Sequence, residues 1–256
     1  MDKENDRYVL LMEDCSKYTL AGSIQSEITL DHLKKITLAL ANFHSRWWHS
    51  RANPHPELTW IQYFSDFISD PYWGGVCMQR WREFLQIDEA RNALPEGCIE
   101  IGDSIFSRWN SFSDGFPSNN LTINHSDFKA DNIFFDWSDR EDPVIIFDWA
   151  SFMIGRGVSD LARLLASSIE AELRRQIELD IVKYYHERIT DSCLDRYSFE
   201  ECLADYRRSL LMYSYFPILA FSLNDTSNEK ARIHGRQVVN RWFSAIIENE
   251  AMEFLP

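Results

Sequence analysis

Apolar residues recur at intervals of three and four positions along most of this 256-residue chain, a spacing that predicts a mainly helical protein. The pattern begins at Leu30 and predicts a helix over 30–49, for which Thr29 or Asp31 can serve as the N-cap. Pro217 is expected to bend or end the helix in which it falls, because it lacks the backbone N–H of a helix interior. The same spacing predicts further helices over 60–69, 73–87, 97–110, 158–170, 171–189, 198–223 and 227–252.

Four short runs of apolar, β-branched or aromatic residues interrupt the helical pattern and predict strands. The first run, over 7–12, reads as a buried strand that ends at the acidic pair Glu13-Asp14. The other three, over 121–123, 133–135 and 144–147, are separated by polar loops. We therefore expect one domain of the α+β class, mainly α with a small β hairpin at its centre.

The polar loop after the second predicted strand contains a possible catalytic motif. His125, Asp127 and Asn132 have the H-x-D-x-x-x-x-N spacing of the catalytic loop of protein kinases. Asp148 follows the fourth predicted strand, where a second metal-binding group is expected. Phosphoryl transfer requires that a hydroxyl be aligned with the γ-phosphate of ATP and that Mg²⁺ neutralise the phosphate charge.

Each of these residue types has a role in that chemistry. Asp127 would accept the proton of the acceptor hydroxyl, and Asn132 and Asp148 would supply oxygen ligands to Mg²⁺. Lys129 would stabilise the transferring phosphoryl group, and His125 would hold the loop by hydrogen bonds.

A wider stretch of sequence matches more than the general kinase spacing. The segments NHSDFKADNIFFD and PVIIFDWASFMIGRGVSDLARLL resemble the aminoglycoside phosphotransferase and choline kinase-like families, including their ecdysteroid kinase-like branch. In those families a H-G-D-x-x-x-x-N loop leads through a hairpin to an Asp-Trp or Asp-Phe metal site, and then to an Asp-Leu-Ala helix start, here at Asp160. Ser126 stands where the families usually have Gly. YVLLMEDC and ALANFHSRWW resemble the families' hinge strand and a following helix, so the likeness covers residues 7 to about 220.

The resemblance implies an ATP- and Mg²⁺-dependent phosphotransferase that acts on the hydroxyl group of a small molecule. It implies that the chain over 1–256 is a single lobe, the C-terminal lobe of the protein kinase-like fold. That lobe would contain a hinge strand over 7–15, a catalytic loop and metal-site hairpin over 121–150, and a helical acceptor-side subdomain over 158–252. Within the hinge strand, Met12, Glu13 and Cys15 would contact adenine.

In these families an N-terminal nucleotide lobe precedes the hinge, whereas this sequence begins at the hinge, so we expect the lobe to be absent. A start codon assigned too far downstream, a truncated gene and a protein that works without a nucleotide lobe would each explain this. We expect self-association through the apolar surface that the missing lobe would normally cover.

The resemblance also places the acceptor between the catalytic loop and the helices that follow it. Five aromatic residues over 198–245 are candidates to line this site: Tyr206, Tyr213, Tyr215, Phe216 and Trp242. Abundant aromatic rings and a negative net charge would suit a cationic acceptor such as an aminoglycoside or a choline-like amine.

Two other functions are compatible with parts of the sequence. A non-catalytic binding or scaffold protein could retain the fold without the nucleotide lobe. A metal-dependent hydrolase built on His125 and Asp127 is disfavoured, because no second His or Cys ligand has a suitable spacing.

We expect Asp160 to cap a helix, and we expect the cluster of His44, His49, His55, Trp47 and Trp48 to pack a helix rather than bind a metal.

Composition, the length of the apolar runs and the N-terminal residues limit which partners and which cellular location we expect. Lys and Arg number 26 against 40 Asp and Glu, and the resulting net charge of −14 argues against a nucleic-acid partner. Every apolar run is much shorter than the roughly 20 residues that span a bilayer, so no membrane span is expected. The charged N-terminus lacks the apolar core of a secretory signal, which favours a cytoplasmic protein whose five scattered cysteines are reduced.

Overall fold

A computed structural model of the chain describes residues 9, 11–22, 28–114, 116–138, 141–191, 197–223 and 229–256. The described helices are α1 (Leu30–Arg46), α2 (Phe64–Ser69), α3 (Pro71–Leu85), α4 (Asp88–Arg91), α5 (Cys98–Ser107), α6 (Val158–Ser168), α7 (Ala171–Thr190), α8 (Phe199–Met212), α9 (Tyr215–Leu223) and α10 (Glu229–Glu248). The strands are β1 (Thr19–Leu20), β2 (Thr122–Asn124), β3 (Ile133–Phe135), β4 (Val144–Ile146) and β5 (Met153–Gly155). The protein is therefore mainly helical with small antiparallel sheets, as the hydrophobic pattern predicts.

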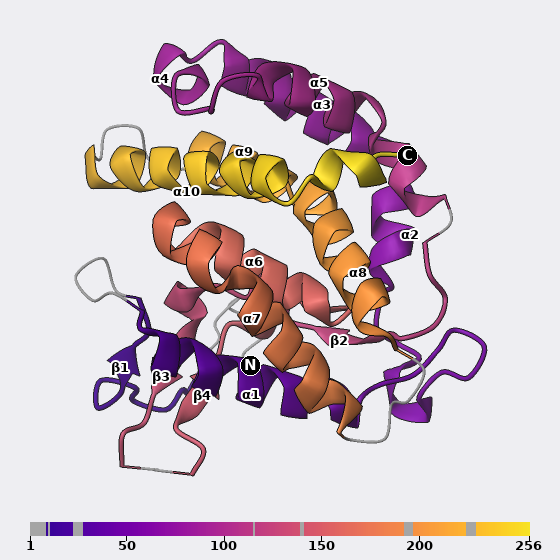
Figure 1. Cartoon of the computed structure of the whole chain (residues 1–256), viewed down its shortest axis with the longest axis vertical. Helices are drawn as coiled ribbons and strands as arrows, with labels where there is room; N and C mark the ends of the chain where they lie inside the picture. The colour runs from indigo at the N-terminus through magenta and orange to yellow at the C-terminus, as the bar shows by residue number, and fades with distance from the viewer. Residues whose placement is uncertain are drawn as a thin grey trace.

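The helices are stacked in layers above the strands (Figure 1). In that view α3 and α5 form the outermost layer, α9 and α10 lie beneath them, and α6 and α7 come next. The strands β1, β3 and β4 lie with α1 at the opposite end of the molecule from α3 and α5. Every residue of α6 from Val158 to Ser167 is buried, so this helix is the centre of the core.

The strands form two separate antiparallel sheets. The predicted hairpin is confirmed, because Ile133 of β3 pairs with Ile146 of β4 and Phe135 pairs with Val144. β1 adds to the other edge of β3, which gives the strand order β1-β3-β4. β2 instead pairs with β5, a strand that the sequence pattern did not predict. The loop between β2 and β3 therefore joins the two sheets.

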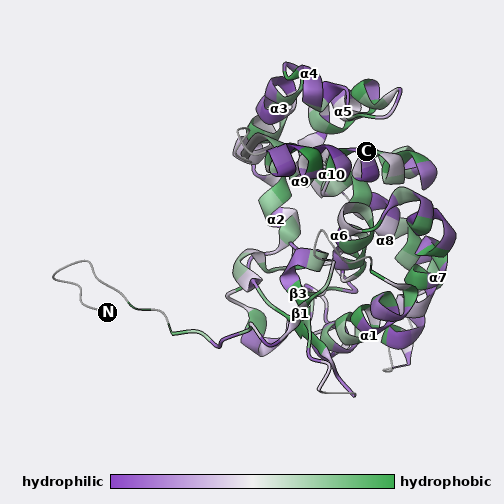
Figure 2. Ribbon diagram, turned by 90° about the vertical axis from the view of Figure 1, so that its left-hand side faces the viewer, coloured by the Kyte–Doolittle hydropathy of each residue, from purple (hydrophilic) through white to green (hydrophobic). Residues whose placement is uncertain are grey.

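The buried strand predicted over 7–12 is wrong for the residues that can be checked. Val9, Leu11 and Met12 lie outside any strand and are 86%, 91% and 77% exposed, while residues 7, 8 and 10 are outside the described residues. The segment leads away from the helical body (Figure 2). The strand that pairs with this edge of β3 is β1, and the described residues of the apolar run pair with no strand.

Helix boundaries follow the expected capping chemistry. The Thr29 hydroxyl accepts a hydrogen bond from the His32 N–H at 3.2 Å, and the His32 ring accepts one from the Thr29 N–H, so Thr29 is the predicted N-cap of α1. The helix predicted over 198–223 is two helices, α8 and α9. Pro217 lies in the first turn of α9, where no backbone donor is needed, and the break precedes it at Tyr213.

Two further expectations concern the cysteines and membrane spans. The described cysteines are free thiols, and three of them, Cys77, Cys98 and Cys202, are buried. Among the described helices, none combines the length and the apolar character that a bilayer crossing requires.

Gly157 gives a test of how tightly the residues before α6 are packed. A Cβ atom at this position would lie 2.3 Å from the Tyr185 hydroxyl and 2.8 Å from Nδ1 of His44, two atoms that hydrogen-bond to each other. We expect Gly157→Ala to destabilise the protein by about 2–3 kcal/mol through this overpacking, which lowers Tm by roughly 5–10 °C in calorimetry. The control is Gly75→Ala in α3, where the added Cβ meets no atom within 4 Å. An unchanged Tm for Gly157→Ala would contradict this packing.

Candidate active site

The loop between β2 and β3 carries the kinase-like motif, and a carboxylate from α6 holds it. Oδ2 of Asp160 accepts a hydrogen bond from the His125 N–H at 2.6 Å, and Oδ1 accepts one from the Ser126 N–H at 2.9 Å. Asp160 makes no side-chain cap to its own helix, so the prediction that it caps α6 is wrong. Ser126 has a φ of +65°, a conformation that glycine adopts without strain, which explains the usual Gly at this position in the families it resembles.

The Asp160 carboxylate is in turn supported from α1 and α7. Nε2 of His44 lies 3.3 Å from Oδ2 of Asp160, and Nδ1 of His44 lies 2.8 Å from the Tyr185 hydroxyl. The backbone carbonyl of His44 also accepts a hydrogen bond from the Thr122 hydroxyl at 2.8 Å. His44 is fully buried. Through its contacts with Asp160 and Thr122, this member of the predicted packing cluster supports the loop that carries the motif.

His125 connects the catalytic loop to the loop that carries Asp148. One ring nitrogen, Nε2, lies 2.7 Å from the carbonyl oxygen of Phe147, and the other, Nδ1, accepts a hydrogen bond from the Asp127 N–H at 3.3 Å. With the Asp127 N–H directed at Nδ1, Nε2 is the ring nitrogen placed to donate to the Phe147 carbonyl. The ring also packs against Trp149, with centroids 4.7 Å apart. His125 therefore contacts both its own loop and the residue that precedes Asp148.

The Asp127 carboxylate lies among three donors. Oδ1 accepts a hydrogen bond from Nη2 of Arg163 at 2.7 Å. Oδ2 accepts one from Nδ2 of Asn132 at 3.1 Å, and Nζ of Lys129 lies 3.0 Å from it. Burial acts to raise the pKa of Asp127, but the adjacent Arg163 and Lys129 cations lower it below its ordinary value. Asp127 is therefore ionised at neutral pH.

Asn132 and Asp148 lie at the same end of the β3–β4 hairpin. Asn132 directly precedes β3, and Asp148 follows β4 after Phe147. The Phe147 N–H donates to the Asn132 carbonyl at 3.1 Å, which ties the two flanking segments together. The Asp148 side chain is exposed, and its backbone φ of +63° turns the chain away from β4. The structure thus brings the two candidate metal ligands to one end of one hairpin.

The candidate adenine-contacting residues precede β1, near the other end of β3. Thr19 of β1 pairs with Phe135, the last residue of β3, so the preceding segment lies beyond that end. Met12 and Glu13 are exposed and Cys15 is half-buried. The Glu13 carboxylate accepts a hydrogen bond from the Tyr18 hydroxyl at 2.7 Å, which lowers the pKa of Glu13. These residues and the metal-ligand candidates are therefore separated along β3.

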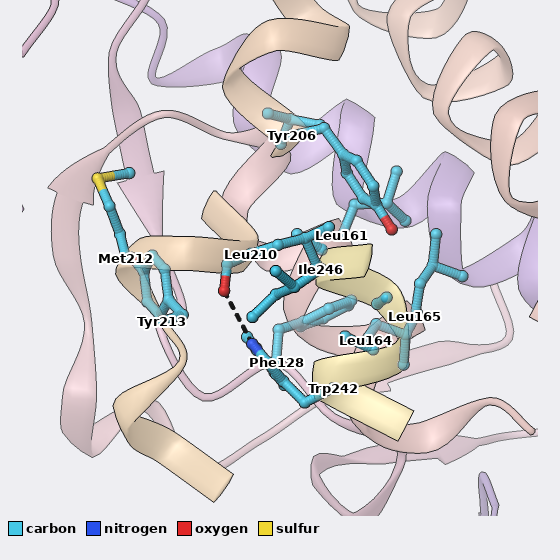
Figure 3. Close-up of a cluster of buried hydrophobic side chains, with 14 of the residues drawn as sticks. Phe128, Leu161, Leu164, Leu165, Tyr206, Leu210, Met212, Tyr213, Trp242 and Ile246 are labelled. Carbon is cyan, nitrogen blue, oxygen red and sulfur yellow. Dashed lines mark hydrogen bonds between the residues drawn. The ribbon is translucent and has the colours of Figure 1, made fainter. Parts of the chain in front are cut away.

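Most of the aromatic residues expected to line an acceptor site belong to the core instead. Tyr206, Tyr213, Tyr215 and Trp242 are between 0% and 7% exposed, which corrects the expectation that they line a site open to a ligand. Figure 3 shows Trp242 in this core, where its indole N–H donates to the Leu210 carbonyl at 2.8 Å. Phe128 of the catalytic loop points into the same cluster and is fully buried. Of the five candidates, Phe216 alone is only partly buried.

Sequence reasoning missed two residues that shape this site. Arg163 contacts Asp127 directly, and Asp160 binds the loop rather than capping a helix. Both lie in the segment SDLAR at the start of α6, where three-residue spacing places them on the same side of the helix. Apart from Asp160 and Arg163, α6 contains only apolar residues and serines. Two charged residues in such a helix were the sequence signal that could have identified them.

Within the described ranges, no three or more His, Cys, Asp or Glu side chains converge as a metal site. The candidate metal ligands Asn132 and Asp148 are not such a group, because they are only two residues and one of them is an amide.

Asp160→Asn tests whether this carboxylate holds the catalytic loop. An amide can accept only through its oxygen, so one of the two loop N–H groups would face an NH₂ group in the interior. We expect a loss of about 3 kcal/mol, a Tm lower by roughly 6–12 °C, and faster hydrogen exchange at the His125 and Ser126 amides. Asp191→Asn, at an exposed carboxylate paired with Arg188, is the control. Unchanged protection of both amides in Asp160→Asn would refute the assignment.

Comparisons with known proteins show what this chain is similar to. A solved structure of a protein from Ralstonia eutropha JMP134, provisionally named an aminoglycoside phosphotransferase, is similar at 14% sequence identity with a TM-score of 0.44. The match covers 86% of this chain and 64% of that protein, so the chain spans less than two thirds of its length. A search of curated proteins finds no match. The model of the ecdysteroid kinase-like family matches residues 1–199, and the chain therefore belongs to that family.

Proposed function

We propose that this protein transfers the γ-phosphoryl group of ATP, with Mg²⁺, to a hydroxyl group of a small molecule. The observation that supports the proposal is the pair of contacts that Asn132 makes, one to Asp127 and one to the segment that leads to Asp148. Asn132 donates to the Asp127 carboxylate, and its backbone is tied to the residue that precedes Asp148. Membership of a kinase-like family supports the same reaction class.

Asp127 would orient the acceptor hydroxyl and accept its proton. Its lowered pKa means that the carboxylate is ionised and can accept a hydrogen bond from the hydroxyl at neutral pH. Lys129 is 32% exposed on a flexible stem, so its ammonium group can leave Oδ2 and turn toward a phosphoryl group. With Arg163 and Lys129 beside Asp127, we favour an acceptor whose reacting end carries no cationic group.

Asn132 and Asp148 are suited to hold Mg²⁺. Both offer oxygen atoms, the ligands that Mg²⁺ prefers, and Nδ2 of Asn132 is engaged with Asp127, which leaves Oδ1 for a metal. With one carboxylate and one amide, the pair leaves room for the phosphate and water ligands that Mg²⁺ usually keeps. When bound, the ion would neutralise charge on the phosphates.

The nucleotide would lie along β3, with adenine beside Met12, Glu13 and Cys15 and the phosphates near Asn132. The three residues of β3 extend over about 10 Å, which separates the two ends of this site. In this proposal the chain corresponds to a kinase-like C-terminal lobe, with the acceptor-side helices over 158–252. Activity of this chain would depend on how it holds the nucleotide.

Binding of Mg²⁺ and ATP is the first test. At ten times the dissociation constant we expect bound MgATP to raise Tm by roughly 3–5 °C, since a ligand that binds only the folded state stabilises it. Asp148→Asn should lose the Mg²⁺-dependent part of the shift, whereas Asp66→Asn, at an exposed carboxylate paired with Arg51, should retain it. No shift in the unaltered chain would favour the alternative, a non-catalytic kinase-like binding or scaffold protein.

The second test concerns Asp127. Asp127→Asn should reduce phosphoryl transfer from ATP to an accepting hydroxyl compound by about 10²–10⁴-fold, because the amide cannot take the proton. ³¹P NMR of the protein with ATP and a panel of small alcohols, sugars and sterols would measure the transfer at a temperature where both proteins are folded. Transfer that persists at the original rate in Asp127→Asn would rule out this role.

A further inference from the structure

Arg163 is a buried cation in contact with the candidate base. It lies on α6, one turn after Asp160, and its side chain is only 5% exposed. Nη2 donates to Oδ1 of Asp127 at 2.7 Å. The residue was not among the candidates found from the motif, because its contact with Asp127 joins positions 36 residues apart in the sequence.

Aromatic rings hold the guanidinium group in place. Its central carbon lies 3.9 Å from the ring centroid of Phe216 on α9 and 5.5 Å from that of Trp242 on α10. The buried Nε of Arg163 has no hydrogen-bond partner among the described residues. The guanidinium is thus fixed by stacking and by its bond to Asp127.

The two oxygens of Asp127 are held by unlike partners. Oδ1 is bound by a buried, stacked and planar guanidinium, which has little freedom to move. Oδ2 is bound by Asn132 and by the partly exposed Lys129, whose ammonium can leave. One side of the carboxylate is therefore fixed, and the other can exchange a partner for an incoming hydroxyl.

We propose that Arg163 is a positioning residue that fixes the orientation of the Asp127 carboxylate and leaves Oδ2 as the oxygen that receives the acceptor hydroxyl. The inference rests on the proposed function for its catalytic consequence, while the contact itself can be tested without any substrate. Phe216 gives the acceptor-side helix α9 an indirect influence on the same carboxylate, because it orients the guanidinium.

A double-mutant cycle tests the contact in the folded chain. Removing the charge of Asp127 leaves a buried guanidinium without its carboxylate, so Asp127→Asn should lower the folding equilibrium constant by roughly 100-fold or more. Asp127→Asn combined with Arg163→Met should recover about tenfold or more of that loss. Arg174→Met is the matched control, because this buried arginine pairs with Glu178 and Glu248 instead, so its effect should add to that of Asp127→Asn. Additive effects of Arg163→Met and Asp127→Asn would overturn the proposal.

Steady-state kinetics then separate positioning from a merely structural role. Arg163→Met should lower kcat by about 10- to 100-fold at an unchanged KM for MgATP, since misplacement of a reacting group acts on the chemical step. Arg163→Lys should recover part of kcat, and Arg174→Met should leave kcat per folded molecule unchanged. An unchanged kcat in Arg163→Met would overturn the proposal. If the unaltered protein shows no transfer, the proposed function fails, whereas the cycle still decides whether Arg163 fixes Asp127.

Discussion

The candidate site depends on one buried carboxylate. Asp160 accepts the backbone N–H groups of His125 and Ser126, and it thereby satisfies two donors that the left-handed turn at Ser126 directs into the interior. Loss of either bond would leave a buried N–H unpaired, which costs more than the bond itself contributes. Because Asp160 lies in α6, where every residue from Val158 to Ser167 is buried, the position of this loop is set by the core.

From this anchor the loop makes short contacts among its own residues and with the segment that precedes Asp148. His125 bonds to the carbonyl before Asp148, and Asn132 bonds to Asp127 and to the backbone of Phe147. Phe128 enters the core from the same loop, so its polar residues are held between an apolar anchor and the β3–β4 hairpin. The motif is thus held by the Asp160 carboxylate and by backbone contacts, while Arg163 and Lys129 place two cations beside Asp127.

Two buried ion pairs in the described part of the chain join different elements. Arg163 of α6 meets Asp127 of the catalytic loop, and Arg156 after β5 meets Asp205 of α8. Burial raises the pKa of Asp205 even though Arg156 and Tyr197 act to lower it, which shows how strongly desolvation acts in this core. Burying such a pair costs free energy. Replacing one partner is nevertheless destabilising, because the other charge then stays buried without a counter-charge.

The sequence by itself determined the helical class, the β3–β4 hairpin, the capping of α1 and the identity of the motif residues, because all of these depend on local spacing. It misjudged Val9, Leu11 and Met12, since an apolar run does not by itself specify that other elements will cover it. It also placed Tyr206 and Trp242 at a ligand site, although apolar periodicity cannot tell a ring in the core from one that lines a cleft. Only the tertiary structure decided that Asp160, Arg163 and His44 support the catalytic loop, because their contacts join segments 34 to 116 residues apart. A local sequence pattern does not specify contacts between residues so far apart in the chain. These groups meet only because the other elements pack around α6.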